Sequence, residues 1–300
     1  MKTLQEEQGI GHVLVSEPMR HHTTFRVGGP CDWMIVPRTE EEIVQAVRTV
    51  QARELPWMIL GNGSNLLVKD GGIRGAVIRI AENYSDITIE DNRLYAQAGA
   101  LLSDVAEQTV SASLAGFEFA SGIPGTVGGA MVMNAGAYGG EMKDITTAVR
   151  IYDGTEIRTI PAADMGFAYR HSNVLSNGWI VLGAEFTLQP DHADDIRARI
   201  DDLTAQRESK QPLEWPSAGS TFKRPEGYFA GKLIDDAGLR GFRYRDAQVS
   251  EKHCGFVINR GNASCADILT LIECVQKAVL EEHGVQMERE VKLIGEDACE

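Results

Sequence analysis

The feature that most constrains the fold is the uncharged segment 119–140, where glycine recurs at a density that ordinary helices and strands do not tolerate. Pro124 and the polar residues Ser121, Thr126 and Asn134 interrupt it, so it does not form a membrane-spanning helix. Ordering glycine costs conformational entropy, and such a density rarely occurs without need. We therefore expect an ordered, buried loop system that serves either tight packing between strands or the close approach of a ligand.

Composition narrows the class of protein. The chain has 300 residues, 43% of them hydrophobic, which is enough for one large domain or two to three smaller ones. Its formal net charge is −14 and no run of Lys or Arg offsets it, so nucleic acid is not an expected partner. The first seven residues carry acids where a signal peptide is apolar, and we expect a cytoplasmic protein without membrane insertion.

Cysteine and histidine usage indicates neither disulfides nor a metal site. The five cysteines are an odd number and include no Cys-x-x-Cys pair, which favours reduced thiols. The only neighbouring histidines are His21 and His22, and no His-Glu-x-x-His spacing occurs. We expect no metal.

Helical and extended patterns alternate along the chain, which predicts a mixed α+β protein. The clearest helix start is a capping box at 39–42, and the clearest long helix is 264–283, closed by Gly284. Further helices are expected at 103–114, 193–210 and 231–238, and strands at 57–60, 76–80, 149–154, 253–259 and 285–294. Proline residues at 212 and 216 follow the helix 193–210, so a domain boundary is expected near 205–212.

Two glycine-rich segments are candidate ligand loops. Gly61-Asn62-Gly63-Ser64-Asn65 follows an apolar strand, where glycine lets backbone N–H groups approach a pyrophosphate closely. It is not the usual dinucleotide fingerprint, because Leu66 stands where the third glycine belongs, and a plain turn is the alternative. The second segment is 121–129 followed by 133–139, and together the two loops could hold one long dinucleotide.

Six motifs are spread over nearly the whole chain. They are Thr23-Thr-Phe-Arg-Val-Gly-Gly-Pro30, the segment from Leu60 to Asp70, Tyr169-Arg-His-Ser172, Pro216-Ser-Ala-Gly-Ser-Thr-Phe-Lys-Arg-Pro225, Ala230-Gly-Lys-Leu-Ile-Asp235 and Glu288-Arg-Glu-Val-Lys-Leu-Ile-Gly295. In order and spacing, these motifs resemble the UDP-N-acetylenolpyruvoylglucosamine reductases. The resemblance is to the shorter branch of the family, which lacks an inserted segment carrying a substrate-covering tyrosine. It implies an α+β fold, with an FAD-binding fold of the vanillyl-alcohol oxidase (PCMH) type in two subdomains plus a C-terminal α/β substrate domain.

The resemblance also implies domain bounds, cofactors and activity. The FAD-binding region is expected over 1–205, split near 80, and the substrate-binding domain over 206–300. FAD is expected to bind non-covalently and NADPH to donate hydride, so that UDP-N-acetylglucosamine enolpyruvate is reduced to UDP-N-acetylmuramate for peptidoglycan synthesis. The implied partner is thus a small UDP-sugar. The matching FAD-binding positions are Gly61, Asn62, Gly63, Ser64, Asn65, Leu66, Gly122, Ile123, Gly125, Thr126, Gly128 and Gly129.

Three residues match the family's catalytic positions. Hydride addition to the enol ether pushes negative charge onto its carboxylate, and the resemblance assigns Arg170 to stabilise that charge. Ser220 matches the residue that donates a proton to C2 afterwards, and Glu290 matches the catalytic glutamate. Tyr169 and Lys223 match positions near the substrate, where their side chains can hydrogen-bond diphosphate oxygens.

Two departures and two alternatives remain open at this point. Arg224 stands where some relatives carry asparagine, and Lys292 where others carry arginine, and both departures concern the nucleotide contacts. One alternative is another flavin oxidase or dehydrogenase of the PCMH type, although no histidine for covalent attachment is evident. The other is a flavin- or UDP-sugar-binding module without turnover, which would be expected to lack the catalytic residues.

Overall fold

The computed structural model describes residues 4–298, which divide into two compact units. Unit 1 contains residues up to Leu14, then Trp33–Asn62 and Ala76–Arg207. Unit 2 contains Val15–Asp32, Gly63–Gly75 and the chain from Glu208 onward. Each unit buries a hydrophobic cluster of its own, so each has its own core.

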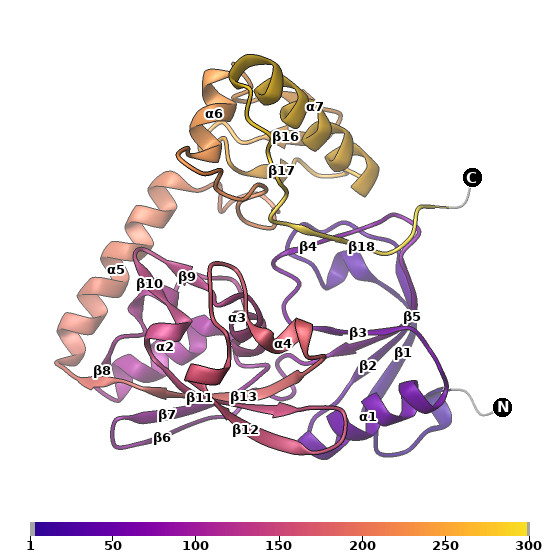
Figure 1. Cartoon of the computed structure of the whole chain (residues 1–300), viewed down its shortest axis with the longest axis vertical. Coiled ribbons are helices and arrows are strands. Elements are labelled where there is room, and N and C mark those ends of the chain that lie inside the picture. The colour runs from indigo at the N-terminus through magenta and orange to yellow at the C-terminus, as the bar shows by residue number, and fades with distance from the viewer. Residues whose placement is uncertain (1–3, 299–300) are drawn as a thin grey trace. The chain divides into compact units, whose positions relative to one another are not determined.

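Unit 1 is built on a five-stranded antiparallel sheet (Figure 1). Its strand order is β12 (Ile157–Pro161), β11 (Thr146–Tyr152), β13 (Ile180–Thr187), β7 (Arg93–Gln97) and β6 (Ile87–Glu90). The central strand β13 is buried at its first five residues, because both of its faces are covered. Such a continuous apolar run lacks the period-two alternation that identifies a strand from sequence, and we did not predict it.

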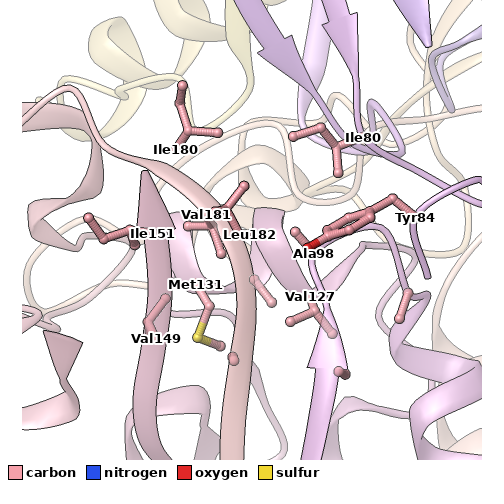
Figure 2. Packing of buried hydrophobic residues seen from close by; sticks show 14 of the residues in the cluster. Ile80, Tyr84, Ala98, Val127, Met131, Val149, Ile151, Ile180, Val181 and Leu182 are labelled. Carbon is pink, nitrogen blue, oxygen red and sulfur yellow. The ribbon is translucent and has the colours of Figure 1, made fainter. Parts of the chain in front are cut away.

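The helices of unit 1 include α1 (Glu40–Ala52), α2 (Leu102–Ser111), α3 (Val127–Met133) and α4 (Asn173–Ser176), and α5 (Ala193–Lys210) belongs to this unit as far as Arg207. Val127 and Met131 of α3 lie in the same buried cluster as Val181 and Leu182 of β13 (Figure 2). This packing holds the glycine-rich segment against the sheet.

The predicted start of α1 is confirmed in part. Thr39 caps the helix, since its Oγ1 accepts a hydrogen bond of 3.2 Å from the amide of Glu42. The Glu42 carboxylate does not complete the capping box, because Oε2 accepts from the amide of Arg38 at 2.7 Å. The helix predicted at 193–210 is confirmed as α5, and the helix predicted at 103–114 is confirmed as α2, although α2 ends three residues earlier, at Ser111.

The prediction that the whole segment 119–140 is loop is wrong, because α3 lies inside it. Thr126 caps α3 by accepting from the amide of Gly129, and Asn134 ends it in the left-handed conformation, with a φ of 42°. Two consecutive glycines disfavour helix locally. Burial of Val127, Ala130 and Met131 overrides that preference.

A four-stranded sheet has the order β1 (His12–Pro18), β2 (Pro30–Val36), β5 (Ile73–Arg79) and β3 (Trp57–Leu60). Strands β3 and β5 pair in parallel, which confirms the strands predicted at 57–60 and 76–80. The smaller elements are β8 (Leu114–Ala115) paired with β14 (Gln189–Pro190), β9 (Gly136–Ala137) paired with β10 (Gly140–Glu141), and the 3₁₀ helices Leu4–Glu6, Met19–His21, Glu118–Ala120, Met142–Asp144 and Ala162–Asp164.

Unit 2 contains two helices and a three-stranded antiparallel sheet. Helices α6 (Ala230–Asp236) and α7 (Cys265–His283) confirm the predicted helices, and Gly284 ends α7 with a φ of 68°. The sheet has the order β15 (Arg243–Tyr244), β16 (Ala247–Val249) and β17 (Val257–Asn259), and α7 packs against it. A parallel pair joins β4 (Leu66–Val68) to β18 (Lys292–Ile294).

Two predicted strands are longer than the observed ones. Only 257–259 of the segment 253–259, and only 292–294 of the segment 285–294, form regular strands. His253 Nδ1 instead accepts a hydrogen bond from the amide of Gly255 and makes a local turn. Within residues 4–298, no helix has the length and apolar character needed to cross a membrane.

Candidate functional site

The two glycine-rich loops meet within unit 1. Gly61 follows β3, and a Cβ on it would lie 2.5 Å from the Oγ1 atom of Thr126. Asn62 Nδ2 donates a hydrogen bond of 2.9 Å to the carbonyl of Pro124. The structure therefore brings together parts of the two segments that the sequence proposed as one ligand site.

The rest of the first loop, Gly63 to Leu66, belongs to unit 2. Gly63 has a φ of 61°, and a Cβ there would lie 2.1 Å from the carbonyl oxygen of His22. Both facts require glycine. The carbonyl of Asn65 accepts a hydrogen bond of 2.9 Å from the amide of Lys292, so this departure from the family pattern lies directly beside the loop.

The second loop is anchored by its backbone. The amide of Gly128 donates to the carbonyl of Ala98 at 2.8 Å, and the carbonyl of Gly125 accepts from the amide of Leu102 at 3.0 Å. At Gly129 the backbone is bare, since this residue is exposed and a Cβ on it would meet only Thr126 Oγ1, at 3.7 Å. Bare backbone of this kind fits a dinucleotide cofactor, which needs close approach to main-chain groups.

Arg170 lies in a tight turn of unit 1. Ala168 and His171 exchange two backbone hydrogen bonds of 3.0 and 3.1 Å, and Arg170, between them, has a φ of 53°. Its guanidinium carbon lies 5.0 Å from the centre of the Tyr169 ring, a cation–π contact. Tyr169 is 54% exposed, so the two predicted residues present an aromatic ring and a cation at one place.

The turn is tied to the end of α3. Asn134 Nδ2 donates to the carbonyl of Ala168 at 3.1 Å and to Glu141 Oε2 at 3.0 Å. Lys143 is the main cause of a lowered pKa of Glu141, with smaller contributions from Asn134 and from the charge of Arg170. Asn134 thus links the turn that carries Arg170 to the carboxylate of Glu141.

Ser220 and Glu290 come together in unit 2. Directly after Ser220, the segment 221–223 pairs antiparallel with 288–290, through bonds of 2.9 Å from the amide of Glu290 to the carbonyl of Thr221 and from the amide of Lys223 to the carbonyl of Glu288. Ser220 is exposed and bridges to Phe256 on its other side. The structure therefore places two of the three predicted catalytic residues on neighbouring strand segments, and Arg170 belongs to unit 1.

The predicted substrate residue Lys223 shares this pair of segments. Its Nζ lies 2.8 Å from Glu288 Oε2, and this partner lowers the pKa of the Glu288 carboxyl. The next residue, Arg224, stacks its guanidinium carbon 4.0 Å from the centre of the Phe229 ring. In the part of the chain that the structure describes, no group of three His, Cys, Asp or Glu side chains is arranged to hold a metal.

Comparison with known proteins identifies the family. Residues 211–294 match the model of the UDP-N-acetylenolpyruvoylglucosamine reductase C-terminal domain, and residues 31–159 match that of an FAD binding domain. The UDP-N-acetylenolpyruvoylglucosamine reductase of Clostridioides difficile (strain 630) is 54% identical over 95% of this chain and 94% of its own length. That of Agathobacter rectalis is 53% identical over 99% and 98%. The chain belongs to the UDP-N-acetylenolpyruvoylglucosamine reductase family.

A solved structure of the family agrees with this assignment. UDP-N-acetylenolpyruvylglucosamine reductase from Thermus caldophilus has a TM-score of 0.80 and 35% identity, covering 94% of this chain and 98% of its own. The predicted α+β fold class with an FAD-binding domain is confirmed. This reductase therefore uses FAD, and the bare backbone at Gly61 and Gly129 fits that cofactor.

The sequence of this reductase did not lead us to single out one residue that lies beside the glycine-rich loops. Arg207, near the end of α5, lies against Gly122. It stands among many charged residues of an amphipathic helix, where the sequence gives no signal that separates a buried arginine from a solvated one.

Proposed function

We propose that this chain reduces UDP-N-acetylglucosamine enolpyruvate to UDP-N-acetylmuramate, a precursor of peptidoglycan, with NADPH as hydride donor. Family membership supports the activity, and the structural observation that supports the site assignment is the pairing of segment 221–223, next to Ser220, with 288–290. When bound at the glycine-rich loops, FAD would supply the hydride chemistry that links NADPH to the vinyl carbon of the substrate. The protein must then stabilise the negative charge that develops on the substrate carboxylate and deliver a proton to C2 of the substrate.

Arg170 has the role of stabilising the negative charge that develops on the substrate carboxylate. A guanidinium stays charged at all working pH values and offers paired donors to a carboxylate. The tight turn at 168–171 fixes the backbone from which this side chain projects. A fixed cation needs little reorganisation as the charge develops, and preorganisation of this kind contributes most to catalysis.

Ser220 has the role of donating a proton to C2 of the substrate. A hydroxyl is a weak acid and suits this task only beside a strongly basic carbanion. Glu290, on the adjacent segment, has the role of placing charge or relaying a proton. Tyr169 and Lys223 have the role of binding the substrate diphosphate; Tyr169 is exposed and Lys223 is half-buried.

We assign FAD binding to 1–205, with two subdomains split near 80, and substrate binding to 206–300. The matched FAD-binding region 31–159 and C-terminal region 211–294 support this division. The compact unit that contains most of the substrate-binding region also includes Val15–Asp32 and Gly63–Gly75. We also assign the chain to the cytoplasm, which the free cysteines Cys31, Cys254, Cys265 and Cys274 support.

The two half-reactions test these roles separately. Anaerobic stopped-flow absorbance near 450 nm follows FAD reduction by NADPH and then reoxidation by the enolpyruvyl substrate. Ser220→Ala should leave reduction within about twofold of the unsubstituted chain and slow reoxidation by roughly 10²–10⁴-fold, the usual contribution of a general acid. Ser217→Ala, the same change three residues earlier in the motif, is the matched control and should alter neither rate.

The other outcomes are equally informative. Equal slowing of both half-reactions by Ser220→Ala would remove the proton-donor role. Reoxidation of the unsubstituted chain by oxygen, but not by the enolpyruvyl substrate, would replace the proposed activity with that of an oxidase.

A further inference from the structure

Backbone hydrogen bonds within unit 2 join the first glycine-rich loop to the segment that carries Glu290. The carbonyl of Asn65, in the loop, accepts a bond of 2.9 Å from the amide of Lys292. From there β4 and β18 pair in parallel, and beyond both strands the amide of Lys69 donates to the carbonyl of Ile294 at 2.9 Å. The loop is therefore continuous with a two-stranded ladder, and Glu290 precedes that ladder by two residues.

A second set of hydrogen bonds connects Glu290 to the segment that follows Ser220. The amide of Glu290 donates to the carbonyl of Thr221, and the amide of Thr221 donates to the carbonyl of Gly255, both at 2.9 Å. Thr221 is buried, and its Oγ1 also accepts from the amide of Val257 at 3.0 Å. Ser220 thus adjoins a residue that is bonded on both sides, and one of those sides leads through Glu290 and β18 to the glycine-rich loop.

The ladder of β4 and β18 is too short to be stable alone. It consists of two strands of three residues each, and parallel pairing is slightly weaker per residue than antiparallel pairing. Residues 284–291, which lead into β18, form no helix and a single isolated bridge. The far end of the ladder is held by bonds between 71–72 and Glu296, whereas its near end is formed by Asn65 of the loop itself. Whatever fixes the loop therefore also fixes the near end of the ladder.

We propose that FAD binding at the first glycine-rich loop stabilises the ladder of β4 and β18 and thereby holds Glu290 and Ser220 in place. The inference rests on the proposed assignment of residues 61–66 to FAD binding. Residues 63–66 lie in the same compact unit as β18, so a ligand that orders them orders the Asn65 carbonyl at the end of the ladder. A ligand that prefers the closed form of such a ladder shifts the population toward that form. Cofactor binding thus prepares the residues proposed to act on the substrate.

Amide hydrogen exchange of the full chain, with and without FAD, tests the proposal. The reporters are the amides of Glu290 and Lys292, and the amides of Ile272 and Val275 inside α7 report global unfolding. Without FAD, the reporters should exchange at least roughly tenfold faster than the α7 amides, because the ladder opens locally. FAD also stabilises the whole fold, so the measured quantity is the ratio of the two rates, which FAD should lower by about tenfold. A ratio that FAD leaves unchanged would overturn the proposal.

Lys292→Pro separates transmission through the ladder from direct contact of FAD with the Glu290 segment. Proline has no amide hydrogen, so this variant loses the bond to Asn65 and leaves the loop residues unaltered. Exchange of the Glu290 amide should then no longer respond to FAD. Linkage requires the Kd for FAD to rise by the factor by which FAD lowered the exchange ratio in the unsubstituted chain, about tenfold. A Glu290 amide that still responds in Lys292→Pro would contradict transmission through the ladder.

Lys292→Ala is the matched control, because it removes the same side chain and keeps the amide. It should retain the response of the Glu290 amide to FAD. The α7 amides show whether each variant is folded, and the comparison made on the unsubstituted chain stands without the variants. Failure of the unsubstituted chain to bind FAD would contradict the cofactor assignment, whereas turnover of the enolpyruvyl substrate with an unchanged exchange ratio would remove this inference alone.

Discussion

At the scale of single residues, the role proposed for Arg170 conflicts with local stability. Its φ of 53° lies in the left-handed region, which suits glycine and asparagine and is unfavourable for arginine. In tight turns without a functional constraint, a position with this conformation is usually occupied by Asn or Gly. The unfavourable conformation is consistent with selection for the guanidinium rather than for the turn.

Arg170→Asn should therefore leave the free energy of unfolding unchanged or raise it by up to about 1 kcal/mol, since asparagine tolerates this conformation. The same substitution should slow reoxidation by the enolpyruvyl substrate by roughly 10²–10³-fold, because a preorganised donor to developing charge is lost. Urea unfolding and the second half-reaction measure the two effects. Arg158→Asn, at an exposed position in β12, is the control: it should leave reoxidation unchanged and cost only the small contribution of an exposed ion pair with Asp153. A loss of stability well above 1 kcal/mol would show that Arg170 is chiefly structural.

At the scale of elements, α7 has its N-terminus capped from two places in the chain. Ser264 Oγ accepts from the amide of Asp267 at 3.0 Å, and the Asp267 carboxylate accepts in return from the amide of Ser264. Asp70, which follows β4, accepts from the amides of Cys265 and Ala266 at 2.8 and 3.0 Å. The free amides of the first turn thus meet both a local capping box and a distant carboxylate.

Asp70→Ala should lower the free energy of unfolding of unit 2 by about 0.5–2 kcal/mol, because it leaves two helix amides without their acceptor and removes a negative charge from the helix N-terminus. Hydrogen exchange of the amides of Cys265 and Ala266 should accelerate. Asp201→Ala, at an exposed position in α5, serves as the comparison and should be close to neutral. Unchanged exchange at the first turn of α7 in Asp70→Ala would show that the local capping box suffices.

The elements predicted correctly are those whose signals are local. Helices α5 and α7 have long patterns with clear ends, and the Ser264 and Gly284 caps lie in the sequence itself. Helix α3 was missed because its stability comes from burial against β13, which overrides the preference of two glycines. Strand β18 was overextended because its length is set by its partner β4, more than two hundred residues earlier.

The candidate site likewise has features that local sequence motifs indicate and features that only the structure reveals. Motifs identified Ser220 and Glu290 individually, and the structure adds that backbone hydrogen bonds hold their segments together. The contact between Gly122 and Arg207 has no counterpart in any local pattern. Contacts between residues far apart in the chain depend on tertiary packing, which cannot be predicted from the local patterns of a single sequence.

At the scale of the whole molecule, charge should determine how stability depends on pH. The chain carries a net charge of −14 at pH 7, so like charges repel one another across its surface. Against this, among residues 4–298 native contacts hold the pKa values of eight carboxyl groups below their usual range, through backbone amides or through arginine and lysine partners. These groups are Glu41, Glu107, Glu141, Asp153, Asp191, Asp235, Asp246 and Glu288.

The two effects act in different ranges of pH. A carboxyl whose folded pKa is depressed contributes stability above its unfolded pKa, and that contribution is lost as pH falls through the folded value. Carboxyl groups titrate near pH 4 in the unfolded chain, so this loss of stability should begin at about that pH and grow below it.

Between pH 7 and 5 these eight carboxyl groups stay ionised, while protonation of other groups begins to reduce the net negative charge. Urea unfolding midpoints should thus be level or slightly higher at pH 5 than at pH 7, and should fall steeply between about pH 4 and 3. Added salt at pH 7 should raise the midpoint if repulsion matters, because screening weakens it. A midpoint that falls steadily from pH 7 to 5 would instead assign the acid sensitivity to groups other than these carboxylates.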